Sequence, residues 1–130
     1  MDPALLGVVL DSSVLIAAER RNLTAAEAVW SVQNIIGEAA VAMSALTVAE
    51  IGHGIYRAGT PEIRERRRLF LNELKATVPI YAVTETSAEI IARIGGEQAA
   101  RGVVLPLADL IIGACALELG YAIGTGVNAG

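Results

Sequence analysis

Three acidic residues stand where a carboxylate could take part in chemistry. Asp11 directly follows an apolar run without another polar group, Glu50 lies inside a predicted helix, and Asp109 comes shortly after Pro106. Three carboxylates near one another repel, and a hard divalent cation removes that repulsion. Oxygen-only ligands favour Mg²⁺ or Mn²⁺ over zinc, and Mg²⁺ leaves room for a substrate phosphate. A water activated by such an ion can attack phosphorus, so the pattern predicts metal-assisted attack on a phosphate.

Each acid also has an ordinary structural interpretation. Asp11 could cap the helix that follows it, Glu50 could be a solvated helix residue, and Asp109 could complement a helix dipole. Their combined placement favours a shared site: one acid follows the first strand, one lies in the helix after the second, and one opens the last helix. The sequence contains no competing Gly-rich phosphate loop, no G-x-S-x-G elbow and no Asp-x-Asp after the first strand.

Short apolar stretches between the helices predict the sheet that positions these acids. The predicted strands are Leu5 to Leu10, Ala39 to Met43, Val78 to Val83 and Tyr121 to Thr125. The first lacks alternation, as expected of a parallel strand buried on both faces, and Pro79 confines the third to an edge or a strand start. Strands alternating with helices predict an α/β fold with a parallel sheet, whose carboxyl edge is the usual ligand site. We find no linker or repeat, so residues 1–130 are predicted to form a single domain.

Capping residues indicate where the helices begin and end. Ser12 and Ser13 can cap a helix that runs to Glu19, and Thr24-x-x-Glu27 is a capping box. The other predicted boundaries are helix starts at Ser44, Thr60-Pro61, Thr86-x-x-Glu89 and Pro106, and helix ends at Gly37, Gly102 and Gly120.

The composition is that of a globular chain with a large core. Apolar residues make up 54% of its 130 residues, and its mean hydropathy is +0.54. No uncharged apolar run reaches the ~18 residues that a spanning helix needs. The single cysteine, Cys115, permits neither an internal disulfide nor a Cys-based zinc site, and no signal peptide is evident, so we expect a cytoplasmic protein. A net charge of −4 and a pI near 4.9 argue against strong non-specific binding of nucleic acid.

Three short motifs carry a resemblance to a known family. Residues 8–17 (VVLDSSVLIA), 47–51 (TVAEI) and 105–114 (LPLADLIIGA) contain the three acids in order. They resemble the acidic motifs of PIN-domain nucleases, and their spacing resembles that of VapC-type toxins of bacterial toxin–antitoxin pairs. The resemblance covers nearly the whole chain and implies a PIN-like three-layer α/β/α fold.

The resemblance also implies an activity and a set of partners. It implies a Mg²⁺- or Mn²⁺-dependent endoribonuclease that cuts RNA, forms a homodimer and is neutralised by a VapB-like antitoxin. It assigns the catalytic and metal-binding roles to Asp11, Glu50 and Asp109, and leaves the substrate-binding residues unknown.

The chain departs from the family pattern near its end. Thr125-Gly126-Val127-Asn128 places an asparagine one residue later than the family's Thr-x-Asn motif, and no acidic or polar residue follows it. We therefore expect a short or altered tail that supplies no fourth ligand for a second metal. This leaves open a catalytically silent PIN-like module that acts through partner binding. A phosphoryl-transfer domain with Asp11 as acceptor is disfavoured, because Lys75 is the only lysine.

Some other residues invite a functional interpretation. An arginine-rich stretch could hold an RNA backbone, but a solvated helix face is the favoured interpretation: Arg57, Arg64, Arg66, Arg67 and Arg68. His53 lies one turn after Glu50 and is interpreted as structural. Trp30, Phe70 and Cys115 are predicted to be core residues.

Overall fold

A four-stranded parallel sheet forms the centre of the molecule in a computed structural model, which describes residues 6–37 and 39–124. The order across the sheet is β3-β2-β1-β4, so β3 and β4 form its edges. Val8 of β1 is in register with Val41 of β2, and Val9 of β1 with Ile123 of β4. The described elements are β1 (Gly7–Leu10), α1 (Ser12–Arg20), α2 (Ala25–Ile36), β2 (Ala40–Ser44), α3 (Ala45–Tyr56), α4 (Pro61–Thr77), β3 (Ile80–Tyr81), α5 (Glu85–Ala100), α6 (Leu107–Leu119) and β4 (Ala122–Gly124).

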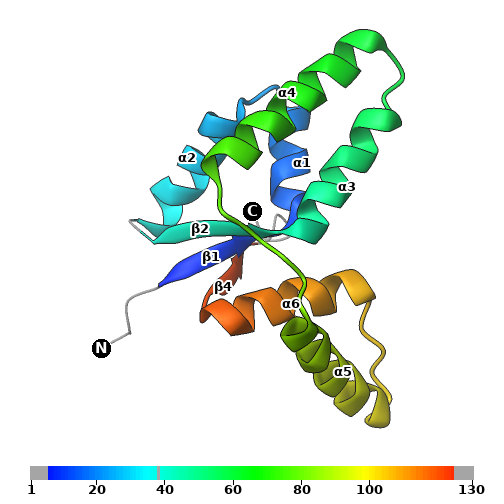
Figure 1. The fold of residues 1–130 in the computed structure, drawn as a ribbon. Helices are drawn as coiled ribbons and strands as arrows, with labels where there is room; N and C mark the ends of the chain where they lie inside the picture. The colour runs from blue at the N-terminus through cyan, green and yellow to red at the C-terminus, as the bar shows by residue number, and fades with distance from the viewer. Residues whose placement is uncertain (1–5, 38, 125–130) are drawn as a thin grey trace.

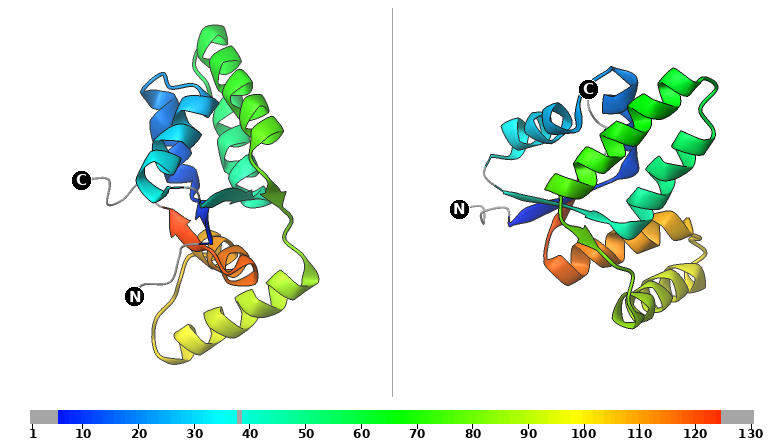
Figure 2. Two further views of the ribbon diagram at one scale, coloured as in Figure 1. Left: turned by 90° about the vertical axis from the view of Figure 1, so that its left-hand side faces the viewer. Right: turned by 45° about the horizontal axis from the view of Figure 1, so that its top comes forward.

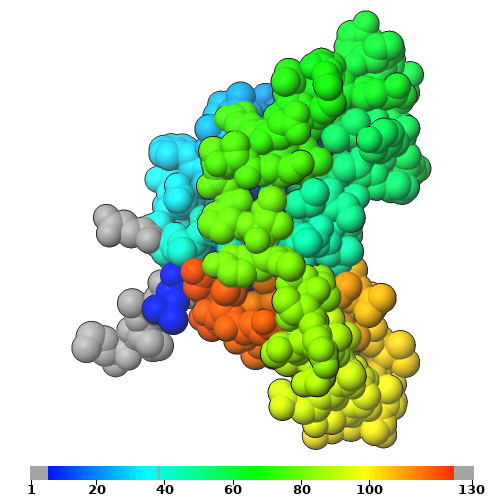
Figure 3. All heavy atoms as spheres, viewed as in Figure 1, coloured from blue at the N-terminus to red at the C-terminus, as the bar shows by residue number. Residues whose placement is uncertain are grey.

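Helices cover both faces of this sheet, which makes three layers. Helices α1 to α4 lie on one face, and α6 lies on the other with α5 packed against it (Figures 1 and 2). The chain after α4 crosses the front of the molecule to reach α5 (Figure 3). The predicted α/β/α architecture with a parallel sheet is therefore confirmed. None of the helices in the described ranges is both long and apolar enough to cross a membrane.

Successive residues of β1 point into two separate cores, as the two-residue period of a strand requires. Val8 and Leu10 pack with Leu15, Phe70 and other residues from the α1–α4 side. Val9, between them, packs instead against Ile112, Cys115 and Ala116 of α6. This explains why the strand is apolar without alternation, as predicted from the sequence.

The capping signals are largely confirmed. Thr24 and Glu27 form the reciprocal capping box of α2, and Thr60 caps α4 with Pro61 in its first turn. Gly120 adopts a left-handed conformation with φ of 69° and ends α6, a conformation that glycine adopts without a steric penalty.

Two predicted helix starts are wrong. The helix predicted to start at Thr86 begins two residues earlier, because Thr84 forms a capping box with Ser87. Neither Ser12 nor Ser13 is the N-cap of α1, because Asp11 keeps an extended backbone and the helix begins at Ser12.

Several strand boundaries and one core residue also differ from the prediction. The third strand is only Ile80–Tyr81, since Val78 serves as the C-cap of α4 and Pro79 can donate no hydrogen bond to a sheet. The second strand extends to Ser44. Trp30 is 64% exposed rather than buried: it lies two positions from the buried Ala28, or about 200° around the helix. Leu5 and Thr125, predicted ends of the outer strands, lie outside the described residues.

Candidate active site

Asp11 lies at the carboxyl end of β1, where the sheet ends and α1 begins. Its backbone N–H donates a hydrogen bond of 2.9 Å to the carbonyl oxygen of Gly124, which ties it to β4. Asp11 occupies the N-cap position of α1, yet its carboxylate accepts no capping hydrogen bond. The carboxylate accepts a long hydrogen bond of 3.4 Å from the Ser12 hydroxyl. The half-buried side chain is therefore positioned by the backbone, and its carboxylate is available to a ligand.

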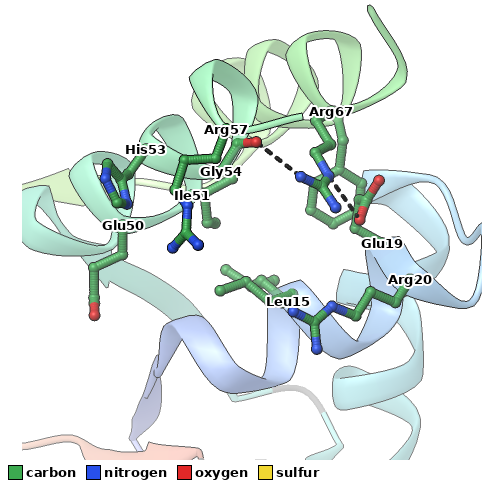
Figure 4. Close-up of a pocket in the computed structure, with 11 residues that line it drawn as sticks. Leu15, Glu19, Arg20, Glu50, Ile51, His53, Gly54, Arg57 and Arg67 are labelled. Carbon is green, nitrogen blue, oxygen red and sulfur yellow. Dashed lines mark hydrogen bonds and ion pairs between the residues drawn. The ribbon is translucent and has the colours of Figure 1, made fainter. Parts of the chain in front are cut away.

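Glu50 reaches the same edge of the sheet from the next strand. Ser44 ends β2 and caps α3, because its hydroxyl oxygen accepts a hydrogen bond of 3.1 Å from the Leu46 N–H. Helix α3 packs against α1 and α6, and Glu50 on this helix is half-buried. It lines a pocket of about 470 Å³ together with Arg20, His53 and Arg57 (Figure 4).

Asp109 lies in the first turn of α6, whose N-cap is Pro106. Because α6 precedes the parallel strand β4, it runs back along the sheet and begins at the edge where β1 and β2 end (Figure 1). The Asp109 side chain is exposed, and it borders a different depression of about 460 Å³ that is lined mainly by apolar residues such as Leu105, Leu110 and Tyr121.

The topology thus brings the three acids to one edge of the sheet but does not gather them into a cluster. No group of three or more His, Cys, Asp or Glu side chains within residues 6–37 and 39–124 is close enough to hold a metal ion. None of the ion pairs among those residues involves Asp11, Glu50 or Asp109. Three carboxylates outside any ion pair, all at one edge, match the oxygen donors that Mg²⁺ or Mn²⁺ prefers, so the chemistry of the donor set fits such an ion although the spacing of the described side chains does not.

The arginine-rich stretch is used mainly for structure. Arg66 and Arg67 contact the carboxylate of Glu19 on α1, with N···O distances of 3.0 and 3.6 Å. Arg67 also donates a hydrogen bond of 2.8 Å to the backbone oxygen of Gly54 on α3, and Arg68 pairs with Glu65 on its own helix. These contacts clamp α4 to α1 and α3. Of the stretch, Arg57 and Arg67 line the pocket beside Glu50.

Sequence reasoning missed two residues at this site. Glu19 is a carboxylate only 5% exposed, and Arg20 lines the same pocket as Glu50. A signal for Glu19 was present: it lies four residues after the buried Leu15 and therefore on the same face of α1. Cys115 is buried as predicted, and its pKa is raised by burial and, to a lesser extent, by Glu118, so its thiol is not an activated nucleophile.

A family model described as the PIN domain matches residues 8–125. The chain belongs to the PIN domain family. The matched range contains all three acids and the strands β2 and β4 that lie on either side of β1. No curated protein matches this chain.

Solved structures agree with this PIN domain assignment. A chain of VapBC-5 from Mycobacterium tuberculosis, a member of the VapBC family of toxin–antitoxin systems, is 27% identical, with a TM-score of 0.69 and coverage of 95% of this chain and 85% of that one. A chain of Rickettsia felis VapBC2, solved with a DNA fragment from its promoter, has a TM-score of 0.73 at 14% identity, covering 89% of this chain and 84% of that one. Neisseria gonorrhoeae FitAcB gives a TM-score of 0.69 at 24% identity, covering 91% of this chain and 86% of its own. The PIN domain of this chain thus has the fold found in structures of toxin–antitoxin complexes. The departure at Thr125–Asn128 lies outside the described residues.

Proposed function

We propose that this PIN domain is a metal-dependent endoribonuclease and the toxin of a toxin–antitoxin pair. The observation that carries the proposal is the family match over residues 8–125, within which Asp11, Glu50 and Asp109 reach one edge of the sheet without ion-pair partners in the described part of the chain. The similarity to chains of VapBC complexes supports the toxin role.

Asp11, Glu50 and Asp109 are the residues proposed to hold Mg²⁺ or Mn²⁺. Such an ion, when bound, activates a water for attack on the RNA phosphodiester and stabilises the negative charge that develops. The Asp11 backbone hydrogen bond to Gly124 holds this residue at the sheet edge, and Glu50 lines the neighbouring pocket, where a substrate phosphate can enter.

The proposal includes two protein partners. A homodimer and a VapB-like antitoxin would each cover apolar surface, and several large apolar side chains are exposed in the described residues, among them Trp30, Ile35 and Leu117. The structures that share this fold include VapBC2 of Rickettsia felis bound to a DNA fragment from its promoter and VapBC of Salmonella typhimurium bound to DNA.

The test is cleavage of defined single-stranded RNAs with Mg²⁺, with Mn²⁺ and with a chelator. We expect cleavage only with metal. Asp11→Asn, Glu50→Gln and Asp109→Asn should each lower the rate at least about 100-fold, because even outer-shell partners of a metal ligand cost about 10–100-fold when removed. Glu73→Gln, an exposed acid on α4, is the matched control and should keep full activity.

The alternative function is a silent module that acts only through a partner. The absence of a three-acid cluster among the described residues is the observation that favours it. A wild-type chain that binds an antitoxin but cuts none of a broad set of RNAs in either metal would establish this alternative and refute the nuclease.

A further inference from the structure

The pocket that contains Glu50 is formed by three helices. Arg20 comes from α1 and Arg57 follows the last residue of α3, while Arg67 and Phe70 come from α4. In Figure 4 the guanidinium groups of Arg20 and Arg57 enter the same open space from opposite walls, and the Glu50 carboxylate lies at one side of it.

The other charged groups of the pocket are already paired. Glu19 is held by Arg66 and Arg67, and Arg67 also donates to the Gly54 carbonyl. Neither Arg20 nor Arg57 has a side-chain hydrogen bond or an ion pair to any residue in the described ranges. The pocket therefore offers two uncommitted guanidinium groups and one uncommitted carboxylate, a local cationic excess on a chain whose net charge is −4.

We propose that Arg20 and Arg57 bind backbone phosphates of single-stranded RNA and draw the strand across Glu50. The inference rests on the proposed function and adds the substrate-binding residues to it. The guanidinium group is a planar fork of N–H donors that matches a phosphate and stays charged at any working pH. Two such forks on opposite walls, with a candidate catalytic acid at one side of the space between them, suit a strand that carries one negative charge per nucleotide.

The assignment also explains how an acidic protein can bind RNA. Arg66, Arg67 and Arg68 are engaged in ion pairs, so the arginine-rich stretch does not act as a continuous basic face. Binding depends instead on a small number of arginines beside the candidate site. An RNA held through few phosphates should show a shallow dependence of affinity on salt.

The experiment compares pocket arginines with matched surface arginines. Arg20→Gln and Arg57→Gln remove pocket groups, whereas Arg21→Gln and Arg64→Gln remove one exposed positive charge each from outside the pocket. All four variants change the net charge equally. A difference in RNA affinity between the pocket pair and the surface pair therefore reflects where the arginine lies and not the loss of charge. Binding of a fluorescein-labelled single-stranded RNA is measured by anisotropy in chelator, where cleavage is prevented, across a range of salt concentrations. Thermal melts establish that each variant is folded.

We expect each pocket variant to bind RNA about tenfold more weakly, the factor for one charge-assisted hydrogen bond. The slope of log affinity against log salt should become shallower by about 0.7 for each phosphate that the variant no longer binds. The two control variants should bind like the wild type. Arg20→Lys and Arg57→Lys keep the charge without the fork, so they should recover the salt slope and part of the affinity. With Mg²⁺ present, the pocket variants should raise KM more than they lower kcat.

The ways in which the inference can fail are distinguishable. If the wild type binds and cuts RNA but the pocket variants match the controls, the arginine assignment is wrong and the nuclease function stands. If the wild type neither binds nor cuts RNA, both are wrong. A poly-glutamate peptide is the second probe: if it binds in an Arg20- and Arg57-dependent manner while RNA does not, the pocket is a peptide site and the inference is overturned.

Discussion

The Asp11 carboxylate occupies a capping position without acting as a cap. A helix N-cap normally accepts a hydrogen bond from a backbone N–H of the first turn, and Asp11 makes none. The structure therefore gives less support to a capping role for Asp11 than the sequence does. Glu50 is half-buried in a pocket rather than solvated on an open helix face. Asp109 alone keeps its structural interpretation intact, since it is exposed in the first turn of α6.

A pair of melting curves separates the two roles of Asp109. If it only complements the helix dipole, Asp109→Asn lowers stability by about 0.3–1 kcal/mol with or without metal. If it binds the ion, the wild type gains about 2.7 kcal/mol when Mg²⁺ is in hundredfold excess over its dissociation constant, and the variant gains little. We expect the second result, measured as thermal unfolding in chelator and in Mg²⁺. If Asp109→Asn were less stable than the wild type by the same amount in chelator and in Mg²⁺, Asp109 would not be a metal ligand.

At the scale of elements, local signals predicted helix starts better than strand ends. The Thr24–Glu27 box and the Thr60-Pro61 start are fixed by hydrogen bonds within a few residues, so the sequence contains all the information. The start of α5 was misplaced because Thr84 and Thr86 both fit a capping pattern. The third strand was predicted too long because its length depends on pairing with β2, which is set by the fold as a whole.

The ion pairs that join Glu19 of α1 to Arg66 and Arg67 of α4 are predicted to add stability to that face of the sheet. The carboxylate of Glu19 is only 7% exposed, while the side chains of Arg66 and Arg67 are 46% and 26% exposed. We expect Glu19→Gln to lower the free energy of unfolding by about 1–3 kcal/mol, less than for a fully buried pair because solvent screens Arg66. The measurement is urea unfolding.

The control for the clamp is Glu65→Gln, which breaks a pair between two exposed side chains on α4. Pairs of this kind contribute about 0.5 kcal/mol or less. Equal losses for the Glu19 and Glu65 variants would mean that burial of Glu19 adds nothing, and the clamp would be an ordinary surface pair.

At the scale of the whole molecule, the sequence predicted which acids reach one edge but not the pocket beside them. The alternation of strands and helices was enough to place Asp11 and Glu50 at one sheet edge, because parallel strands end there. Which arginines form ion pairs was not predictable from the sequence, because Arg66 and its partner Glu19 are 47 residues apart in the chain. Only the ion pairs that join α4 to Glu19 of α1 reveal that Arg66 and Arg67 are occupied and that Arg20 and Arg57 are not.

We expect the homodimer to form through the depression beside α6. The depression beside α6 has Asp109 on its border and is otherwise lined by apolar residues and Gly113, and Leu117 and Ile123, which line it, are 59% and 43% exposed. Covering such a surface is favourable at about 25 cal/mol per Å², so we expect a dimer by light scattering at tens of micromolar. Leu117→Asp should yield a folded monomer, because dimerisation would then bury a charge. Ile35→Asp, which places the same charge at an 85% exposed position on α2, should leave the dimer intact. A monomeric wild type contradicts the dimer itself, and dissociation by Ile35→Asp alone would move the interface to α2.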